Sequence, residues 1–400
     1  MPVTQSLHEM PGQAPLLTDR RPVPEISRQF SEQLRLYKAD NNLRQRRIET
    51  PFDSSAARAV ISSRFEGQDV DTVDLGGDKA LRIRFTARGG LLVPHTDSIW
   101  REESNGTGEK YARFLQDAQR QAKRDGVPIG ISTAGKVEGT RLVEYTNADA
   151  FMAAFERYGS DFKELMPNVT AVNNDAEAAI KTAILEAELR ALLTDTDGIN
   201  GIIVPIVGGG NGGGAAVKKF EGSPVQDLPP QATGKTVSIF AMEPGHVEML
   251  NPMNPMNQKV PDDPCGFEGQ PFVCVENAIG GVKGIESRWK KTTGQQLSGR
   301  EIGQLYRGGN QLATEIYDTS ATQLAIQILS MGQTLGLFQK KGDTLVAAHG
   351  NIFKEEGYLA RVAQLLAKEK VHPHFAFTGN ISINAGAEGA AVAALMALAA

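Results

Sequence analysis

Gly201–Val207 reads Gly-Ile-Ile-Val-Pro-Ile-Val and leads directly into Gly208–Gly214, in which six of the seven residues are glycine. A short aliphatic run that ends at glycine is typical of a buried strand followed by a turn. Because glycine lacks a Cβ, the backbone N–H groups of such a turn can approach an anion. The run is weak evidence taken alone, since glycine-rich segments also form flexible loops.

Outward from this strand, short apolar runs alternate with helical patterns from Asp69 onward. The first two strands form a hairpin around a pair of glycines. Alternation of this kind predicts an α/β architecture. We expect strands over 71–75, 80–85, 128–132, 169–172, 201–207, 344–348 and 375–378, and helices over 108–124, 175–190, 354–368 and 388–399.

Residues 1–66 differ in composition from the rest of the chain. Met1–Pro24 is rich in proline and predicts a mobile arm, whereas apolar residues from Ile26 to Tyr37 recur at helical spacing within a pattern that runs from 24 to 65. Pro51 interrupts that pattern, and a second helix is expected over Ser54–Ser63. The charge of this extension is nearly balanced and it lacks a helix-turn-helix spacing, so a structural cap or dimer arm is favoured over DNA binding.

Composition excludes several classes of protein. A net charge of −5 argues against electrostatic attraction of the whole chain to nucleic acid or an anionic membrane. Two cysteines cannot form a disulfide framework. No long apolar run opens the chain, and Gly389–Ala400 is far shorter than the ~20 residues of a membrane span. We expect a cytoplasmic protein. Glycine accounts for 42 of the 400 residues, a larger share than the average of about 7%, and the glycines occur in clusters.

The first glycine cluster lies in the predicted hairpin and reads Asp74-Leu75-Gly76-Gly77-Asp78-Lys79-Ala80-Leu81-Arg82. One interpretation is a plain Asp-Gly hairpin turn. The other is an anion site, in which bare backbone N–H groups face a phosphate and Asp74 holds a divalent cation. Neither glycine cluster is a Walker A sequence or a dinucleotide-binding fingerprint in its proper setting.

The order of segments along the chain is more informative than any one segment. Seven segments, spread over about residues 69–400, resemble the motifs of the ROK family of sugar kinases and sugar-responsive repressors, within the actin/hexokinase-like superfamily. They are Asp74–Gly77, Gly130–Gly139, Asn173–Ala176, Gly208–Gly214, Glu243–His246, Cys265–Glu276 and Gly386–Ala391.

The resemblance implies a fold of two ribonuclease-H-like (actin/hexokinase-type) α/β domains, which close on a sugar and ATP in a central cleft. On this basis, residues 1–66 form a helical N-terminal extension. Residues 67–172, completed by a C-terminal helix over 387–400, form the smaller domain. Residues 173–386 form the larger domain. A homodimer is expected by the same resemblance.

The resemblance also implies a catalytic base and a sugar pocket. Asp175 matches the aspartate that accepts the proton of the attacking sugar hydroxyl, although Asn174 and Asp175 also suit the start of a helix as caps. Both roles can hold together. The residues that match sugar-binding positions are Asn147, Asn174, Glu243, His246 and Glu276.

The phosphates of ATP would contact both glycine clusters. Asp74 matches a residue that holds Mg²⁺ through water. Two positions depart from the family pattern, because Asp78 and Gly209 stand where threonine hydroxyls are expected. Both missing hydroxyls would face the phosphates, and Lys79 could supply compensating charge. The matched positions are Asp74, Gly76, Gly77, Lys79, Arg82, Gly208, Gly210, Gly212, Gly213 and Gly350.

The resemblance also implies a structural zinc site, of which this chain retains only some ligands. His246, Cys265 and Cys274 remain from the family's histidine and three cysteines, while Asp263 stands where the first cysteine is expected. Four extra residues, 270–273, precede Cys274. Sites rich in thiolates hold zinc more strongly, so loss of the metal is at least as well supported as its retention.

The sequence therefore predicts an ATP- and Mg²⁺-dependent kinase that acts on a hydroxyl of a hexose or related cyclitol. The alternative is a non-catalytic sugar-binding sensor or ROK-type regulator that uses the same cleft. Asp175 favours the enzyme, because a sensor needs no base, whereas Asp78 and Gly209 favour the sensor. A DNA-binding repressor is the weakest of the three.

Overall fold

The computed structural model divides the chain into two units, which are described separately. Unit 1 comprises Met1–Thr50, Glu188–Pro230 and Phe240–Gly379, and unit 2 comprises Pro51–Ala187, Gln231–Ile239 and Asn380–Ala400. The structure describes residues 48–76, 79–103, 108–144, 161–189, 199–208, 211–218, 236–242, 248–250, 272–274, 281–355, 357–377 and 382–400.

Unit 2 contains a five-stranded sheet in which three strands run parallel. Strands β2, β5 and β8 are parallel, while β3 pairs antiparallel with both β2 and β4. The expected hairpin of the first two strands is confirmed. The order across the sheet is β4 (Leu91–Glu103), β3 (Lys79–Arg88), β2 (Asp69–Leu75), β5 (Ile129–Thr133) and β8 (Val169–Asn174).

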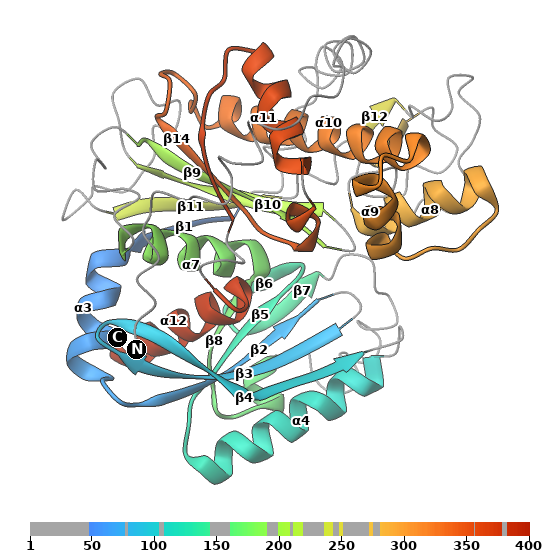
Figure 1. Ribbon diagram of the computed structural model, residues 1–400. Coiled ribbons are helices and arrows are strands. Elements are labelled where there is room, and N and C mark those ends of the chain that lie inside the picture. The colour runs from blue at the N-terminus through green and yellow to red at the C-terminus, as the bar shows by residue number, and fades with distance from the viewer. Residues whose placement is uncertain are drawn as a thin grey trace. The chain divides into compact units, whose positions relative to one another are not determined.

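Helices cover both faces of this sheet (Figure 1). On one face α4 (Gly108–Asp125) packs Tyr111, Phe114 and Leu115 into an apolar core with the strands. The C-terminal helix α12 (Ala385–Ala399) contacts β2, β5 and β8 on the other face. Unit 2 also contains α3 (Ser54–Arg64), α6 (Phe162–Leu165), α7 (Asp175–Leu189) and the hairpin of β6 (Lys136–Glu138) and β7 (Arg141–Glu144).

Glycine allows α12 to lie very close to its neighbours. A Cβ atom at Gly130 of β5 would lie 2.1 Å from the carbonyl oxygen of Ala390, and one at Gly389 would lie 1.8 Å from that of Ala178. Both distances are shorter than real Cβ contacts. The glycines at these two positions therefore fix the depth at which α12 packs against β5 and α7.

The sheet of unit 1 repeats this strand order and adds one strand at an edge. Strands β9, β14 and β15 are parallel, and β10 pairs antiparallel with β9. The order is β1 (Ile48–Asp53), β11 (Thr236–Met242), β10 (Asn211–Lys218), β9 (Gly201–Val207), β14 (Thr344–Ala348) and β15 (His374–Phe377), of which residues 51–53 and 236–239 are counted with unit 2. A separate pair is formed by β12 (Glu248–Leu250) and β13 (Phe272–Cys274).

Four helices and a 3₁₀ turn complete the described part of unit 1. The longest, α10, is buried on nearly all sides from Ala313 to Gly332 and lies with α11 against the sheet (Figure 1). A Ser298–Glu301 capping box starts α9. The helices are α8 (Val282–Thr293), α9 (Gly299–Arg307), α10 (Gln311–Thr334) and α11 (Tyr358–Lys368), and the 3₁₀ turn is Asn351–Lys354.

Three predictions of local structure are wrong. Residues 48–50 begin the strand β1 (Ile48–Asp53), although they fall inside the predicted helical pattern that Pro51 interrupts. The helix expected from 354 begins at Tyr358, because Gly357 has φ +85° and breaks the helical path. Residues 211–214 of the glycine run belong to β10 and not to a loop. The predicted arm and first helix of the N-terminal extension lie outside the described residues.

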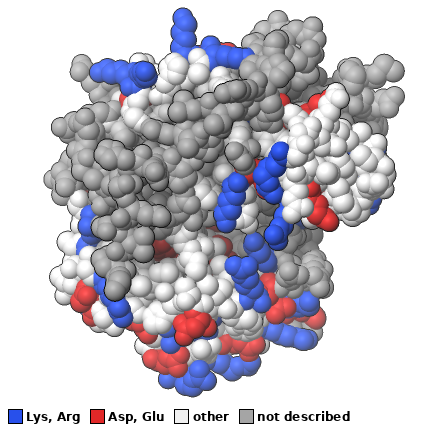
Figure 2. Space-filling model, in the orientation of Figure 1, with Lys and Arg blue, Asp and Glu red and all other residues white. Residues whose placement is uncertain are grey.

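Within the part of the chain that the structure describes, no helix has both the length and the apolar character to cross a membrane. Lys and Arg are interspersed with Asp and Glu on the part of unit 2 that faces the viewer in Figure 2.

Candidate active site

Polar side chains end three neighbouring parallel strands of unit 2. Asp74 of β2 pairs in register with Ser132 of β5, and Thr133 pairs with Asn174 at the end of β8. Asp175 follows as the first residue of α7. Ligands of open α/β sheets bind at the carboxyl ends of the strands. We call Asp74, Ser132, Asn174 and Asp175 the strand-end cluster.

Both oxygens of the Asp74 carboxylate accept hydrogen bonds. Ser132 Oγ donates to Oδ1 at 2.8 Å, and Asn384 Nδ2 donates to Oδ2 at 3.0 Å. Asp74 was predicted, whereas neither Ser132 nor Asn384 was assigned a role from the sequence. The signal for Asn384 was its place before an Ala-rich helix, because asparagine is a good N-cap. The predicted helix began three residues too late to use it.

Asn174 and Asp175 start α7, as the capping interpretation expected. Asn174 Oδ1 accepts from the backbone N–H of Ala176 at 2.9 Å, and its Nδ2 donates to the carbonyl of Gly135 at 2.8 Å. Asp175 Oδ1 also accepts from Ala176 N–H, at 2.8 Å, and the side chain is half-buried. The helix start therefore holds the carboxylate in place, which suits a base that must meet a hydroxyl.

A buried polar chain supports the first turns of α7. Glu177 Oε1 accepts from Asn173 Nδ2 at 3.1 Å and from Lys181 Nζ at 2.8 Å. Both charged side chains are less than 10% exposed. Lys181 Nζ also lies 5.9 Å from the centre of the Phe52 ring. A buried pair that is hydrogen-bonded in this way resists movement, because separating it would leave unpaired charge.

The turn after β2 closes through the backbone. Gly76 N–H donates to the carbonyl of Lys79 at 2.9 Å, and Tyr111 Oη donates to the carbonyl of Gly76 at 2.7 Å. The Lys79 side chain is exposed. Gly77 and Asp78 lie outside the described residues. The described ends of this turn are therefore fixed next to Asp74.

The structure does not bring Arg82 to Asp74. Arg82 is 3% exposed and donates to Asp71 at 2.5 Å and to Gln121 of α4 at 2.5 Å. Asp71 and Asp74 are three residues apart on β2, so their side chains leave opposite faces of the sheet. Hydrogen bonding to Asp71 also raises the pKa of Arg84. The predicted phosphate role of Arg82 is therefore corrected to a structural ion pair beneath α4.

In unit 1 the predicted glycines have different surroundings. Gly208 is exposed, and no atom lies within 4 Å of the position that its Cβ would take. Gly212 and Gly213 lie inside β10, opposite Ile206 and Pro205, so they belong to a paired strand and not to the turn. Gly213 needs glycine, because a Cβ there would lie 2.5 Å from the carbonyl oxygen of Val204.

Gly350 follows β14 and contacts the end of β9. Its φ is +131°, and a Cβ would lie 2.0 Å from the carbonyl oxygen of Val207. His349 ties the same two segments together, since its carbonyl accepts from Val207 N–H at 2.8 Å. The structure thus joins Gly208 and Gly350 through β9, and Gly210 lies outside the described residues.

Most of the predicted sugar and zinc residues fall outside the described residues. These are Asn147, Glu243, His246, Cys265 and Glu276, and their roles stay predictions. Cys274 ends β13, opposite Glu248 of β12. Among the residues that the structure describes, no group of three or more His, Cys, Asp or Glu side chains could hold a metal ion.

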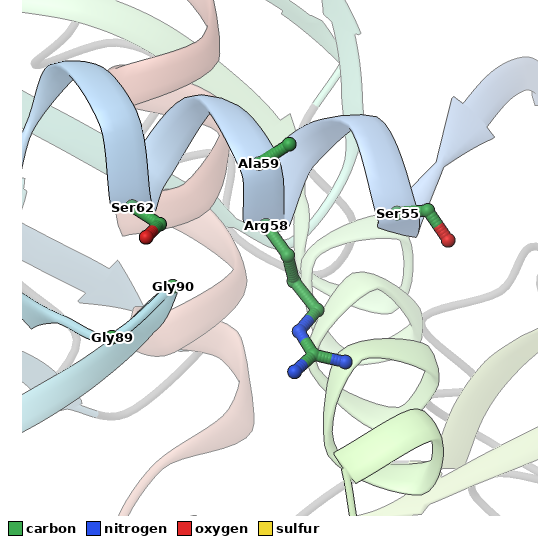
Figure 3. A pocket seen from close by; sticks show the side chains of 6 residues that line it. All are labelled: Ser55, Arg58, Ala59, Ser62, Gly89 and Gly90. Atoms are coloured by element: carbon green, nitrogen blue, oxygen red, sulfur yellow. The ribbon is translucent and has the colours of Figure 1, made fainter.

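A separate cavity of about 290 Å³ lies between α3 and the turn from β3 to β4. Ser55, Arg58, Ala59 and Ser62 line it from one helix face, and Gly89 and Gly90 line it from the turn (Figure 3). The register of β2 with β3 puts this turn beyond Asp69, whereas Asp74 lies toward the other end of β2. The cavity contains none of the predicted site residues.

A family model described as the ROK family matches residues 71–397. The chain belongs to the ROK family. The ROK match covers both sheets except β1 and part of β2, and it leaves α3 outside. No curated protein matches the chain.

Solved structures share the fold of this ROK protein. A ROK hexokinase from Thermus thermophilus is 22% identical, with a TM-score of 0.52 over 83% of this chain and 99% of that one. A ROK family glucokinase from Streptomyces griseus, solved with glucose and AMPPNP, is 19% identical, with a TM-score of 0.50 over 81% and 98%. A glucokinase from Balamuthia mandrillaris, solved with glucose, is 13% identical, with a TM-score of 0.56 over 85% and 98%. The predicted α/β fold of the actin/hexokinase type is therefore confirmed.

Proposed function

We propose that this ROK protein is an ATP- and Mg²⁺-dependent carbohydrate kinase, which transfers the γ-phosphoryl group of ATP to a hydroxyl of a hexose or related cyclitol. The strand-end cluster carries the proposal. In this cluster two carboxylates held by hydrogen bonds, Asp74 and Asp175, lie at the carboxyl ends of parallel strands in a chain of this family, and ligands of open α/β sheets bind at such ends. The structural neighbours named as hexokinase and glucokinases support it.

Asp175 is the proposed base. Phosphoryl transfer needs a group that accepts the proton of the attacking hydroxyl, and such assistance contributes about 10²–10⁴-fold to the rate. Its hydrogen bond to Ala176 N–H and the capping bonds of Asn174 hold the carboxylate at the start of α7. The buried Glu177–Lys181 pair stiffens the turn behind it. Asn174 is thus a positioning residue as well as a predicted sugar ligand.

Asp74 is the residue that we propose holds Mg²⁺ through water. Mg²⁺ prefers oxygen ligands, keeps several waters and is bound through one or two carboxylates together with the substrate phosphates. A single carboxylate beside the Gly76 turn fits that donor set. When bound, the ion neutralises charge on the transferring phosphate. In unit 2, Lys79, Gly76 and Gly77 are the proposed phosphate contacts. In unit 1, Gly208, Gly210 and Gly350 are the predicted phosphate-binding positions.

The test is a coupled ADP-release assay of the whole chain with a panel of hexoses, amino sugars and cyclitols, with and without Mg²⁺. We expect ADP release that needs one class of sugar and Mg²⁺. Release that is equal with and without sugar would point to an ATPase. Absence of release with every member of the panel, while ATP and a sugar both bind, would reject the kinase.

The second candidate is a sugar-binding sensor without turnover. Asp78 and Gly209 favour it, because each removes a hydroxyl expected to face phosphate. A sensor would bind a sugar in calorimetry, release no ADP and lose no function with Asp175→Asn. Sugar-dependent ADP release that falls in this variant would reject the sensor.

Zinc binding and dimerisation are further parts of the proposal. His246, Cys265 and Cys274, with Asp263, are the proposed ligands, and metal analysis of the purified protein tests them. Close to one zinc per chain, lost with Cys274→Ser, would support the site, whereas a zinc-free protein would reject it. Light scattering of the same sample tests the dimer.

A further inference from the structure

The Asp74 carboxylate is oriented by two donors from distant parts of the chain. Ser132 belongs to β5, and Asn384 lies 310 residues beyond Asp74, where it caps α12. A carboxylate that accepts one hydrogen bond on each oxygen has its plane and its remaining lone pairs fixed. The direction in which Asp74 can meet a hydrated cation therefore depends on Ser132 and Asn384.

Asn384 uses both ends of its amide. Its Oδ1 accepts from the backbone N–H of Ala387 at 2.7 Å, and its Nδ2 donates to Asp74 at 3.0 Å. Serine, threonine, aspartate and asparagine are the good N-cap residues. Of these four side chains, only asparagine has its capping oxygen and its donor on two separate atoms, because aspartate has no donor and a hydroxyl carries both functions on one oxygen. Two separate demands, a cap and a donor, thus explain the residue at this position.

The first turn of α12 is also held close to the carboxylate. A Cβ at Gly386 would lie 2.8 Å from Asp74 Oδ1 and 3.0 Å from Ser132 Oγ, so a larger residue would displace both groups. Thr182 Oγ1 donates to the carbonyl of Ala385 at 2.7 Å and ties the same turn to α7. The start of α12 is therefore fixed to the strand-end cluster on two sides.

We propose that Asn384 is a positioning residue, which orients the Asp74 carboxylate toward the Mg²⁺–nucleotide complex and so makes the C-terminal helix part of the site. The inference rests on the proposed function, because Asp74 meets Mg²⁺ only if the protein binds a Mg²⁺–nucleotide complex. Partners that orient metal-binding groups are typically worth about 10–100-fold in metal affinity or activity.

The experiment compares Asn384→Ser with Asn310→Ser in the full chain. Serine keeps a capping oxygen in both variants, but it removes the amide donor to Asp74 at 384. Asn310 is the matched control, because it caps α10 through a 3.0 Å bond from Ala313 N–H and lies in unit 1. We measure Mg²⁺–ADP affinity by calorimetry, kcat, the KM for ATP, the KM for sugar and the unfolding temperature.

We expect Asn384→Ser to weaken Mg²⁺–ADP binding and lower kcat/KM for ATP by about tenfold or more, with the KM for sugar within about twofold of the wild type. Asn310→Ser should leave all kinetic values unchanged. Asn384→Asp keeps the cap but replaces the donor with a second carboxylate. We expect its turnover to fall at least as far as that of the serine variant.

Equal behaviour of Asn384→Ser and Asn310→Ser would overturn the inference and leave Asn384 as a cap alone. If Asn384→Ser does not fold, Asn384→Asp keeps a capping oxygen and removes the donor to Asp74, and an unchanged Mg²⁺–ADP affinity there would overturn the inference as well. A failure of the proposed function is seen in the wild type instead, as absent sugar-dependent ADP release. A wild type that binds no Mg²⁺–ADP would overturn both.

Discussion

The sheets of unit 1 and unit 2 follow the same strand order but differ in what their parallel strands carry at the carboxyl ends. In unit 2 the first strand ends near Asp74, the next at Ser132 and Thr133, and the last at Asn174 and Asp175. The corresponding first strand of unit 1 ends at Val207 before an exposed glycine, and the next is followed by His349 and Gly350.

Under the proposed function, the two sheets would contribute different chemical groups although they share one topology. Unit 2 provides carboxylates and amides that are held by hydrogen bonds, which suits proton transfer and a cation. Unit 1 provides, in the described residues at these strand ends, glycine backbone at a position where a side chain would collide with β9. Bare backbone suits the approach of a phosphate chain. A shared fold therefore does not imply shared chemistry, because the residues at the strand ends decide it.

The largest expected effect comes from removing the base of unit 2. Asp175→Asn keeps the shape of the side chain and its capping oxygen, so we expect kcat to fall by about 10²–10⁴-fold while sugar affinity falls by less than about tenfold. Asp53→Asn is the matched control, because Asp53 caps α3 by accepting from Ala56 N–H at 2.9 Å. Turnover of Asp175→Asn within a few-fold of the wild type would reduce Asp175 to a helix cap.

The next prediction compares substitutions of Asp71 and Asp74, which lie on opposite faces of β2. Asp71 is fully buried and accepts from Arg82 and Arg84, so Asp71→Asn leaves buried positive charge and should lower the free energy of unfolding by about 3–5 kcal/mol. Asp74→Asn should change stability little and weaken Mg²⁺–ADP binding instead. Urea unfolding and calorimetry of both variants check this. A stable Asp71→Asn protein with impaired nucleotide binding would restore Arg82 to the phosphate site.

The sequence predicted the elements whose pattern is local. Gly201–Val207 and Thr344–Ala348 are strands with the predicted bounds, because a short aliphatic run marks a buried strand without reference to the rest of the chain. Asp74 and Asp175 were placed by motif order. The strand Ile48–Asp53 was missed, because it pairs with β11 at the edge of a sheet whose other strands lie far along the chain.

The site features that the sequence did not predict depend on contacts between residues far apart in the chain. Ser132 meets Asp74 across 58 residues and Asn384 meets it across 310, and no local pattern encodes either pairing. Arg82 was assigned by its place in a motif, which does not state the face of the strand. Its partner Gln121 on α4 shows that it points away from Asp74. The glycine run was assigned to one turn, although Gly213 is required by backbone packing inside a strand.

A smaller effect is expected when alanine replaces the glycines at the strand ends of unit 1, where backbone is proposed to approach phosphate. Gly350→Ala must adopt φ near +131° and bring a Cβ against Val207, so the strain should cost about 1–3 kcal/mol of stability. Gly208→Ala meets no atom within 4 Å and should cost less than about 0.5 kcal/mol. Thermal unfolding compares the pair. If Gly208→Ala leaves both stability and Mg²⁺–ADP affinity unchanged, the turn after β9 does not contact phosphate closely.

The smallest expected effect concerns the turn of unit 2 and the residue that departs from the family pattern there. An aspartate at position 78 that faces ATP repels the phosphates unless Mg²⁺ or Lys79 neutralises it. Two like charges about 4 Å apart in water repel by about 1 kcal/mol, and a site less exposed to solvent raises that figure. Removing this repulsion corresponds to about fivefold tighter binding.

We therefore expect Asp78→Thr to bind Mg²⁺–ATP about fivefold more tightly and to turn over faster. Lys79→Gln is the companion variant, which should weaken binding if Lys79 offsets the aspartate. Both are measured at matched ionic strength, because salt screens charges at an exposed turn. Tighter binding with faster turnover in Asp78→Thr would indicate a kinase that has drifted toward a sensor. Weaker binding or lost turnover would show instead that Asp78 itself contacts the metal or a substrate hydroxyl, which would add a third carboxylate to Asp74 and Asp175 in the proposed site of unit 2 and widen its difference from the strand ends of unit 1.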